Sequence, residues 1–498
     1  MGDNLRGRVL NGTKWTVVAQ VGQQAARFVL SIVLARLLLP NDFGTVGMVA
    51  VFAGFANWIG DMGLSAALIQ RSQIDDRHAQ TVFWLNMATA LVFSATMFVS
   101  APLLAGFYDQ PQLAALTRAL SFSFLVSAPG MVPAALLQRR MGFRYLARTS
   151  ILGTVVSGIT GICLAYFGAG VWSLVAQTYA HHFVTTALNT LWAGWRPRWG
   201  FHLHALKDLW RFSVNLLGYS SLNYWAKHAD HMIIGRFMGS AALGFYGRVH
   251  ALMLMPMYQI VNVINRVMFP ALSSIQDDPA RVKRIYLQAL SVIALITSPL
   301  MFGLTATAEP FVLAVYGKNW APMIPLVQIL PLVGLLQAFT GTCGILYMSQ
   351  GRTDWMFRWG LITSGAMITS ILAGIAIGTL EAVAWCYAAA NVLLFYPSVA
   401  IPGSLIGLKF SEVVRTVTSP MIGSVLMLVG VTLVYNITPA TWPYAVELLM
   451  LVLVGAVGYT TLVLITRPLG LQQLLQIARE RFPQLNGRAL FRRASHIP

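Results

Sequence analysis

Long apolar stretches separated by short polar segments occupy almost the whole chain. A helix needs roughly 20 mostly apolar residues to cross the hydrocarbon of a membrane. By this criterion the pattern predicts about fourteen transmembrane helices. Their expected ranges are 12–38, 44–69, 80–105, 114–137, 149–168, 171–193, 212–238, 241–267, 286–307, 323–349, 358–377, 382–405, 416–437 and 444–466. The sequence therefore predicts an all-α integral membrane protein.

Basic and acidic residues lie in alternate loops between the predicted helices. The even-numbered loops carry arginines such as Arg140, Arg198 and Arg352. The odd-numbered loops carry acidic residues such as Asp42 and Asp109 instead. Short cytoplasmic loops of membrane proteins are rich in Lys and Arg. The alternation therefore supports the number of spans and predicts that both termini are cytoplasmic.

The composition decides how the strong positive charge is interpreted. Hydrophobic residues make up 57% of the chain and charged residues 10%, and the formal net charge is +18. A soluble protein this basic would suggest a nucleic-acid partner. Here the basic residues lie in short cytoplasmic loops and a C-terminal tail, where anionic lipid headgroups account for them. We therefore expect contact with membrane lipid and no nucleic-acid partner.

The first and the seventh predicted spans repeat one pattern at an offset of 200 residues. Both carry charge, and Arg27 corresponds to Lys227 as Gly44 corresponds to Gly244. Repeats with the same orientation are related by an axis along the membrane normal. The offset predicts two six-helix lobes related by such a pseudo-two-fold axis around a central cavity. The expected domains are an N-terminal lobe (1–210), a C-terminal lobe (211–410), two extra helices (411–466) and a basic cytoplasmic tail (467–498).

Charged side chains inside the predicted spans are the candidate functional residues. A charge at bilayer depth is costly unless it faces protein or water, so such residues mark transport pathways. Basic residues outnumber acidic ones in these spans, and arginine is suited to binding phosphate oxygens. We therefore expect an anionic substrate. The predicted substrate-binding residues are Arg27, Lys227, Arg248, Arg266, Gln23 and Asn223.

The acidic residues of the spans have two alternative roles. Asp61, Asp230 and His231 are expected either to pair with basic groups or to take up a coupling ion. Because basic residues are in excess, pairing is the favoured role. A purely structural explanation of the charges also stays open, since ion pairs can join packed helices. The pairs considered are Lys227 with Asp230, and Arg27 or Arg266 with Asp61.

The sequence contains no signature of a catalytic site. There is no P-loop, no glycine-rich dinucleotide fingerprint and no His/Cys metal spacing. Cys163, Cys343 and Cys386 lie far apart within apolar spans, as expected of packing residues. The predicted loops are too short to hold a soluble catalytic domain. We therefore expect a transporter that is not an enzyme, with no cofactor and no metal.

Several short motifs resemble those of one family. They include Leu34-Ala35-Arg36, Pro40-Asn41-Asp42-Phe43-Gly44, Asp61-Met62-Gly63-Leu64-Ser65 and Phe107-Tyr108-Asp109-Gln110-Pro111. Together they resemble the bacterial polysaccharide and lipopolysaccharide flippases (Wzx-type) of the multidrug/oligosaccharidyl-lipid/polysaccharide exporter superfamily. Within that family the resemblance is to the branch of the colanic acid exporter, and it covers nearly the whole chain.

The resemblance implies both a fold and a substrate. It implies a MATE-like flippase fold in the bacterial plasma (inner) membrane, working by alternating access. The implied substrate is an oligosaccharide repeat unit linked to undecaprenyl diphosphate, moved from the cytoplasmic to the periplasmic leaflet for exopolysaccharide or O-antigen synthesis. A polysaccharide polymerase and a chain-length regulator are the candidate protein partners.

Two alternative functions stay open. The first is a cation-coupled drug or metabolite antiporter of the same superfamily, for which an acidic cavity would be expected. The second is a polysaccharide polymerase or ligase, which would need a long external loop.

Overall fold

The protein is all-helical in the part of the chain that the computed structural model describes. That part comprises residues 22–60, 65, 68–69, 74–201, 203–439, 441–466 and 468–473. Contacts divide the chain into two compact units, unit 1 (Met1–Gly247) and unit 2 (Arg248–Pro498). The lobe boundaries expected at residues 210 and 410 stay a prediction.

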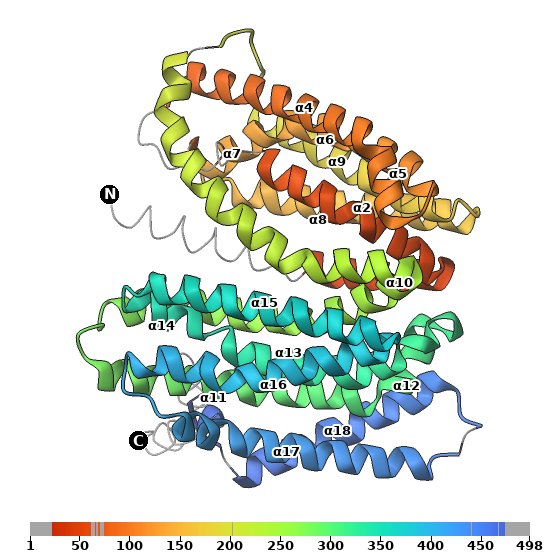
Figure 1. Cartoon of the computed structure of the whole chain (residues 1–498), viewed down its shortest axis with the longest axis vertical. Helices are drawn as coiled ribbons and strands as arrows, with labels where there is room; N and C mark the ends of the chain where they lie inside the picture. Colours follow the sequence, from red (N-terminus) through yellow and green to blue (C-terminus); the bar gives the residue numbers. More distant parts are fainter. Residues whose placement is uncertain are drawn as a thin grey trace, which may run out of the picture. The chain divides into compact units, whose positions relative to one another are not determined.

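Unit 1 is built from long helices that lie side by side (Figure 1). Helix α9 contacts α2, α7 and α8, which makes it the central helix of this packing. An apolar core that includes Val82, Phe83 and Leu136 joins α4 to α7. The elements are a helix over residues 22–37, α2 (Pro40–Gly60), α4 (Asp76–Tyr108), α5 (Gln112–Ser121), α6 (Ser123–Ser127), α7 (Met131–Arg139), α8 (Phe143–Tyr166), α9 (Val171–Ala193) and the first part of α10 (Leu203–Ser273).

Glycines make the tight turns between consecutive helices of unit 1. Gly168 and Gly170, between α8 and α9, have φ angles of 81° and 53°. Gly239 interrupts α10 with a φ of 83° and a ψ of 177°. A side chain is strained at such angles and glycine is not. Glycine at these positions therefore allows consecutive helices to follow each other through tight turns.

Unit 2 contains the remaining helices and a large apolar core. Its fully buried side chains include Tyr286, Ile293 and Phe339, which pack α11 against α13 and α17. The elements after α10 are α11 (Pro279–Ala306), α12 (Ala308–Phe311), α13 (Ile324–Thr340), α14 (Cys343–Ser349), α15 (Thr353–Ile377), α16 (Leu380–Ser404), α17 (Phe410–Ile437) and α18 (Tyr444–Thr466).

The span predicted over 323–349 is broken into α13 and α14. Two side chains of neighbouring helices compensate the break. The amide Nδ2 of Asn265 donates to the carbonyl oxygen of Gly341 at 3.2 Å. The Tyr286 hydroxyl lies 3.0 Å from that of Thr342. The bond to Gly341 matters because a backbone group exposed to lipid has no water to bind.

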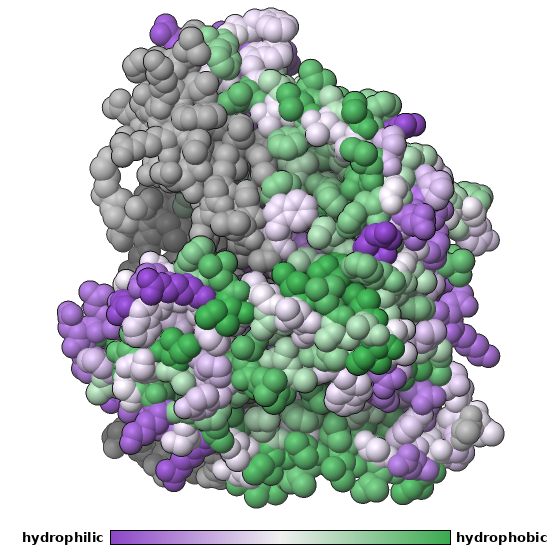
Figure 2. Space-filling model, in the orientation of Figure 1, coloured by the Kyte–Doolittle hydropathy of each residue, from purple (hydrophilic) through white to green (hydrophobic). Residues whose placement is uncertain are grey.

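Many of the described helices can cross a membrane. Nine helical segments within the described residues are long and apolar enough to do so. Each of the fourteen predicted spans overlaps described helical residues at least in part, which is consistent with the predicted number. Apolar side chains also cover broad areas of the surface in view (Figure 2). On α18, for example, Leu453 and Val457 are 57% and 65% exposed, as expected for a helix against lipid.

Candidate functional site

The two glycines of the sequence repeat pack against each other within unit 1. A Cβ atom added at Gly44 would lie 1.6 Å from the carbonyl oxygen of Ser240. A Cβ atom added at Gly244 would lie 2.0 Å from the carbonyl oxygen of Pro40. Ser240 follows Pro40 by the same offset that separates the glycines, so the contact is reciprocal, as at a two-fold axis. The repeat therefore corresponds to a symmetric contact between α2 and α10.

A short polar network surrounds this glycine contact. The Ser240 hydroxyl hydrogen-bonds to Oδ1 of Asn41 on α2. The amide Nε2 of Gln110, between α4 and α5, donates to the same hydroxyl at 3.2 Å. The start of α2 is thus held to the second part of α10 by the close approach of their backbones and by hydrogen bonds between side chains.

The first span presents its polar residues to α8 and α9. Gln23 donates from Nε2 to the Thr154 hydroxyl on α8 at 3.3 Å. Arg27, one turn later, is exposed and lies within electrostatic range of His181 on α9. Arg27 has neither an ion pair nor a hydrogen bond among the described residues. A guanidinium inside a span that has no carboxylate partner is available to bind an anion.

Lys227 on α10 is, after Arg27, the second exposed cation among the predicted substrate-binding residues of unit 1. It forms no ion pair with Asp230 or with any other described residue. The described residues therefore do not show the pair of Lys227 with Asp230 that the structural alternative considered. The physical reason is that Asp230 is buried and is already bonded to other groups.

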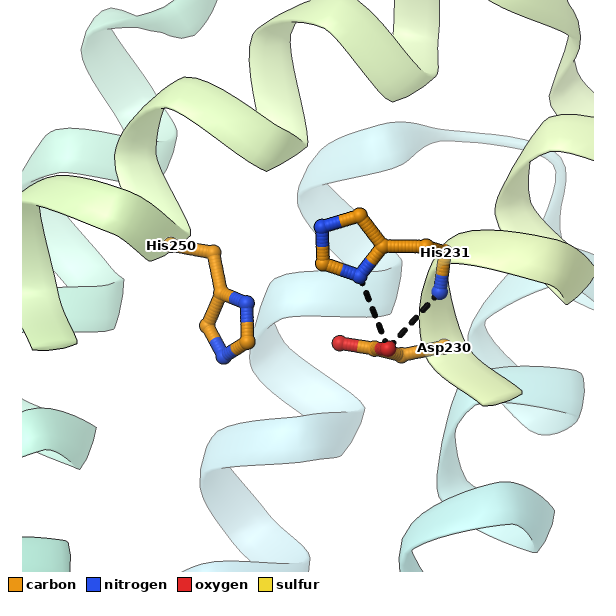
Figure 3. A group of neighbouring side chains, drawn as sticks. All are labelled: Asp230, His231 and His250. Atoms are coloured by element: carbon orange, nitrogen blue, oxygen red, sulfur yellow. Dashed lines mark hydrogen bonds and ion pairs between the residues drawn. The ribbon is translucent and has the colours of Figure 1, made fainter. Parts of the chain in front are cut away.

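Asp230 accepts hydrogen bonds from three groups, and its residue is only 9% exposed. Its Oδ1 accepts from the backbone N–H of His231 at 2.7 Å and lies 2.9 Å from Nδ1 of the His231 ring (Figure 3). Its Oδ2 accepts from the Tyr246 hydroxyl at 3.1 Å. Asp230 and His231 therefore bond directly to each other.

Aromatic side chains gather between α2 and α10, and the sequence analysis missed this cluster. Phe55 lies 4.8 Å from Trp225, and Tyr224 lies 4.3 Å from His228, between ring centroids. The Tyr224 hydroxyl also donates to the carbonyl oxygen of Val51 at 2.7 Å. We call Phe52, Phe55, Tyr224, Trp225 and His228 the aromatic cluster. The available signal was the helical spacing of Phe52 and Phe55, and of Tyr224 and His228.

The remaining predicted site residues are Arg248, Arg266, Asn223 and Asp61. Arg248 is half-buried at the start of unit 2, within electrostatic range of Tyr316. Arg266 is exposed near the end of α10. Asn223 lies in α10, but its side chain is outside the described part of the chain, as is the whole of Asp61. The structure thus brings Gln23 and Arg27 to α8 and α9, and joins Asp230 to His231.

Comparison with known proteins identifies the family. A family model described as "Polysaccharide biosynthesis protein" matches residues 33–325. The succinoglycan biosynthesis transport protein ExoT of Rhizobium meliloti is 30% identical over 482 residues, which cover 96% of this chain and 97% of that protein. The lipopolysaccharide biosynthesis protein WzxC of Escherichia coli is 28% identical, covering 74% of this chain and 76% of that protein.

Solved structures show the same fold at low sequence identity. The lipid II flippase MurJ superposes with a TM-score of 0.70 at 12% identity, covering 92% of this chain and 99% of that one. An inward-facing multidrug resistance MATE transporter of the MOP superfamily gives a TM-score of 0.60 at 16% identity, covering 79% and 96%. The chain belongs to the polysaccharide biosynthesis protein family and has the helical fold shared by MurJ and the MATE transporters.

Proposed function

We propose that the chain is a flippase for oligosaccharide repeat units linked to undecaprenyl diphosphate. It would move them from the cytoplasmic to the periplasmic leaflet of a bacterial inner membrane, with both termini in the cytoplasm. The observation that carries the proposal is Arg27, an exposed cation inside a predicted span that has no partner among the described residues. Relatives named for polysaccharide biosynthesis and transport support it.

The diphosphate is the part of this substrate that needs positive charge. Arg27 offers a planar guanidinium that can bind two phosphate oxygens at once. Lys227 adds a second exposed charge from α10. Gln23, held by Thr154, fixes a polar surface one turn before Arg27. An antiporter for organic cations would need acidic groups at these positions.

The aromatic cluster suits the sugar part of the substrate. Rings such as Phe55 and Trp225 can pack against the apolar face of a sugar, while Tyr224 is held in place by its bond to Val51. In this proposal the glycan lies against the aromatic cluster of α2 and α10, and the diphosphate lies near Arg27 and Lys227.

The polyprenyl tail needs an apolar surface that is open to lipid. Unit 2 has a cavity of about 490 Å³ formed by residues of α13, α16 and α17. Its lining is almost entirely hydrophobic and includes Phe339, Phe395, Met421 and Leu426. Burying a hydrocarbon chain there would be favourable by roughly 0.8 kcal/mol for each CH₂ group.

The acidic pair fits a structural role better than ion coupling. Asp230 is buried and accepts bonds from His231 and Tyr246, so its charge is compensated within unit 1. A coupling carboxylate would need access to a proton or sodium ion. We therefore assign Asp230 and His231 to charge pairing. A polymerase and a chain-length regulator stay the candidate partners for release of the product.

The proposal is tested in a strain that lacks its own flippase. Arg27→Ala should abolish polysaccharide export at normal protein level, and Arg27→Lys should restore part of it, because the charge returns without the bidentate geometry. Arg118→Ala is the matched control, since Arg118 is exposed on α5 and stacks over Phe98. Normal export by Arg27→Ala would refute the assigned role of Arg27.

A further inference from the structure

The fourth predicted span is broken after α6, and the two sides of this break differ. Helix α6 ends at Ser127, one 3-10 turn follows over Ala128–Gly130, and α7 then begins. Protein groups complete the side that faces α9, because the Thr186 hydroxyl donates to the carbonyl oxygen of Val126 at 2.8 Å. A Cβ atom added at Gly130 would lie 2.9 Å from Cα of Thr186, so the backbones pack closely there. Another side of the break contacts α4.

Asn86 of α4 carries a buried amide without a partner on this other side. The residue is 1% exposed, and neither its Nδ2 nor its Oδ1 hydrogen-bonds to any residue that the structure describes. The buried amide of Asn391 in α16 differs, since it donates to the carbonyl oxygen of Tyr387 and accepts from Gln337. An unpaired buried amide is costly, because it has lost its hydrogen bonds to water. Asn86 is therefore suited to a small ligand that both donates and accepts.

The Asn86 side chain lines a small cavity beside the break. The centre of a water molecule can occupy about 10 Å³ of this cavity, which is roughly the space that one water needs. Ser127 lines the cavity too, and its hydroxyl donates to the carbonyl oxygen of Phe124 at 3.0 Å, so its lone pairs can still accept. The rest of the lining is apolar and consists of Ala56, Ala90, Phe93, Phe124 and Met131.

We propose that Asn86 and Ser127 bind one water molecule between α4 and the break. Water donates and accepts hydrogen bonds, as the two polar atoms of the Asn86 amide require. A metal cation is disfavoured, because none of the described lining residues carries a carboxylate or an imidazole. With this water, the break is held from two sides, by Thr186 on α9 and by Asn86 on α4.

Hydroxyl-radical labelling with pulsed X-rays tests this site on the purified full chain in detergent. Ionisation of a bound water produces a hydroxyl radical beside it, and the sulfur of a neighbouring methionine reacts readily with that radical. Met131 lines the cavity and is the reporter. Mass spectrometry should detect oxidised Met131 in the wild type. Asn86→Leu should reduce this oxidation by at least about threefold, because leucine offers the water no hydrogen bond.

Ala90→Val is a second variant, which keeps Asn86 in place. Its added methyl groups would occupy the space of the water, so oxidation of Met131 should fall as in Asn86→Leu. Thr117→Val is the matched control, since Thr117 also has a buried hydroxyl without a described partner but does not line this cavity. In this control, Met131 should be oxidised as in the wild type. Met301, which is 1% exposed in the core of unit 2, should stay unoxidised in every variant.

Two outcomes would overturn the proposal. One is a wild-type protein in which Met131 is not oxidised. The other is wild-type oxidation of Met131 in either Asn86→Leu or Ala90→Val, when that variant elutes at the wild-type volume. None of these measurements depends on flipping activity.

Discussion

Substitution of Gly44 by alanine is the sharpest test of the reciprocal contact between α2 and α10. The new methyl group would lie 1.6 Å from the carbonyl oxygen of Ser240, whereas ordinary contacts at this position begin at 3.4 Å. The obstacle is backbone, so no change of side-chain rotamer can relieve it. The two helices would have to separate by roughly 2 Å, and overpacking of this kind typically costs about 1–3 kcal/mol or more.

The separation can be measured by cross-linking. Asn41 and Ser240 are hydrogen-bonded through their side chains, so cysteines at both positions should form a disulfide readily in a chain whose three native cysteines are replaced. Gly44→Ala should reduce the yield of this disulfide strongly and should also reduce export. Gly244→Ala should have the same effect, because its methyl group would meet the carbonyl oxygen of Pro40.

A glycine with free space around it supplies the control. A Cβ atom at Gly106, near the end of α4, would have no atom within 4 Å. Gly106→Ala should therefore leave cross-linking and export unchanged and stabilise the helix slightly. If Gly44→Ala cross-links and exports as well as Gly106→Ala, the close approach of the two helices is not required.

Two further predictions concern the acidic groups. Asp230→Asn should reduce the free energy of unfolding by about 1–3 kcal/mol, because the bonds to His231 weaken, and flipping in vesicles should respond to an imposed pH gradient as the wild type does. Loss of that response at normal expression would make Asp230 a coupling group. Asp75 caps α4, and its backbone hydrogen bond from His78 lowers the pKa of its carboxyl group. A carboxyl group with a lowered pKa stabilises the folded state at pH values above its ordinary pKa, and this stabilisation is lost as the pH falls. The difference in melting temperature between the wild type and Asp75→Ala should therefore become small in acid.

The helices could be predicted from the sequence, whereas the breaks and the partners of the charges could not. Hydropathy identifies a span because each helix that crosses the membrane must be apolar over roughly 20 residues and must form its own backbone hydrogen bonds. The break between α13 and α14 depends on Asn265 and Tyr286, which lie far away in the sequence. Likewise, Asp230 was expected to bond one helical turn away, but its Oδ2 bonds to Tyr246 beyond the turn at Gly239. The repeat indicated Gly44 and Gly244, but it did not indicate that the two glycines touch.

The break between α13 and α14 has a consequence for the order of membrane insertion. The carbonyl oxygen of Gly341 depends on Asn265, and Thr342 depends on Tyr286. Both partners precede the break in the chain, so both are synthesised before this span reaches the translocon. The broken span can therefore enter beside helices that already offer it hydrogen bonds. A fragment that began after Tyr286 would have to insert the same span with the carbonyl oxygen of Gly341 facing hydrocarbon and without the Tyr286 partner of the Thr342 hydroxyl.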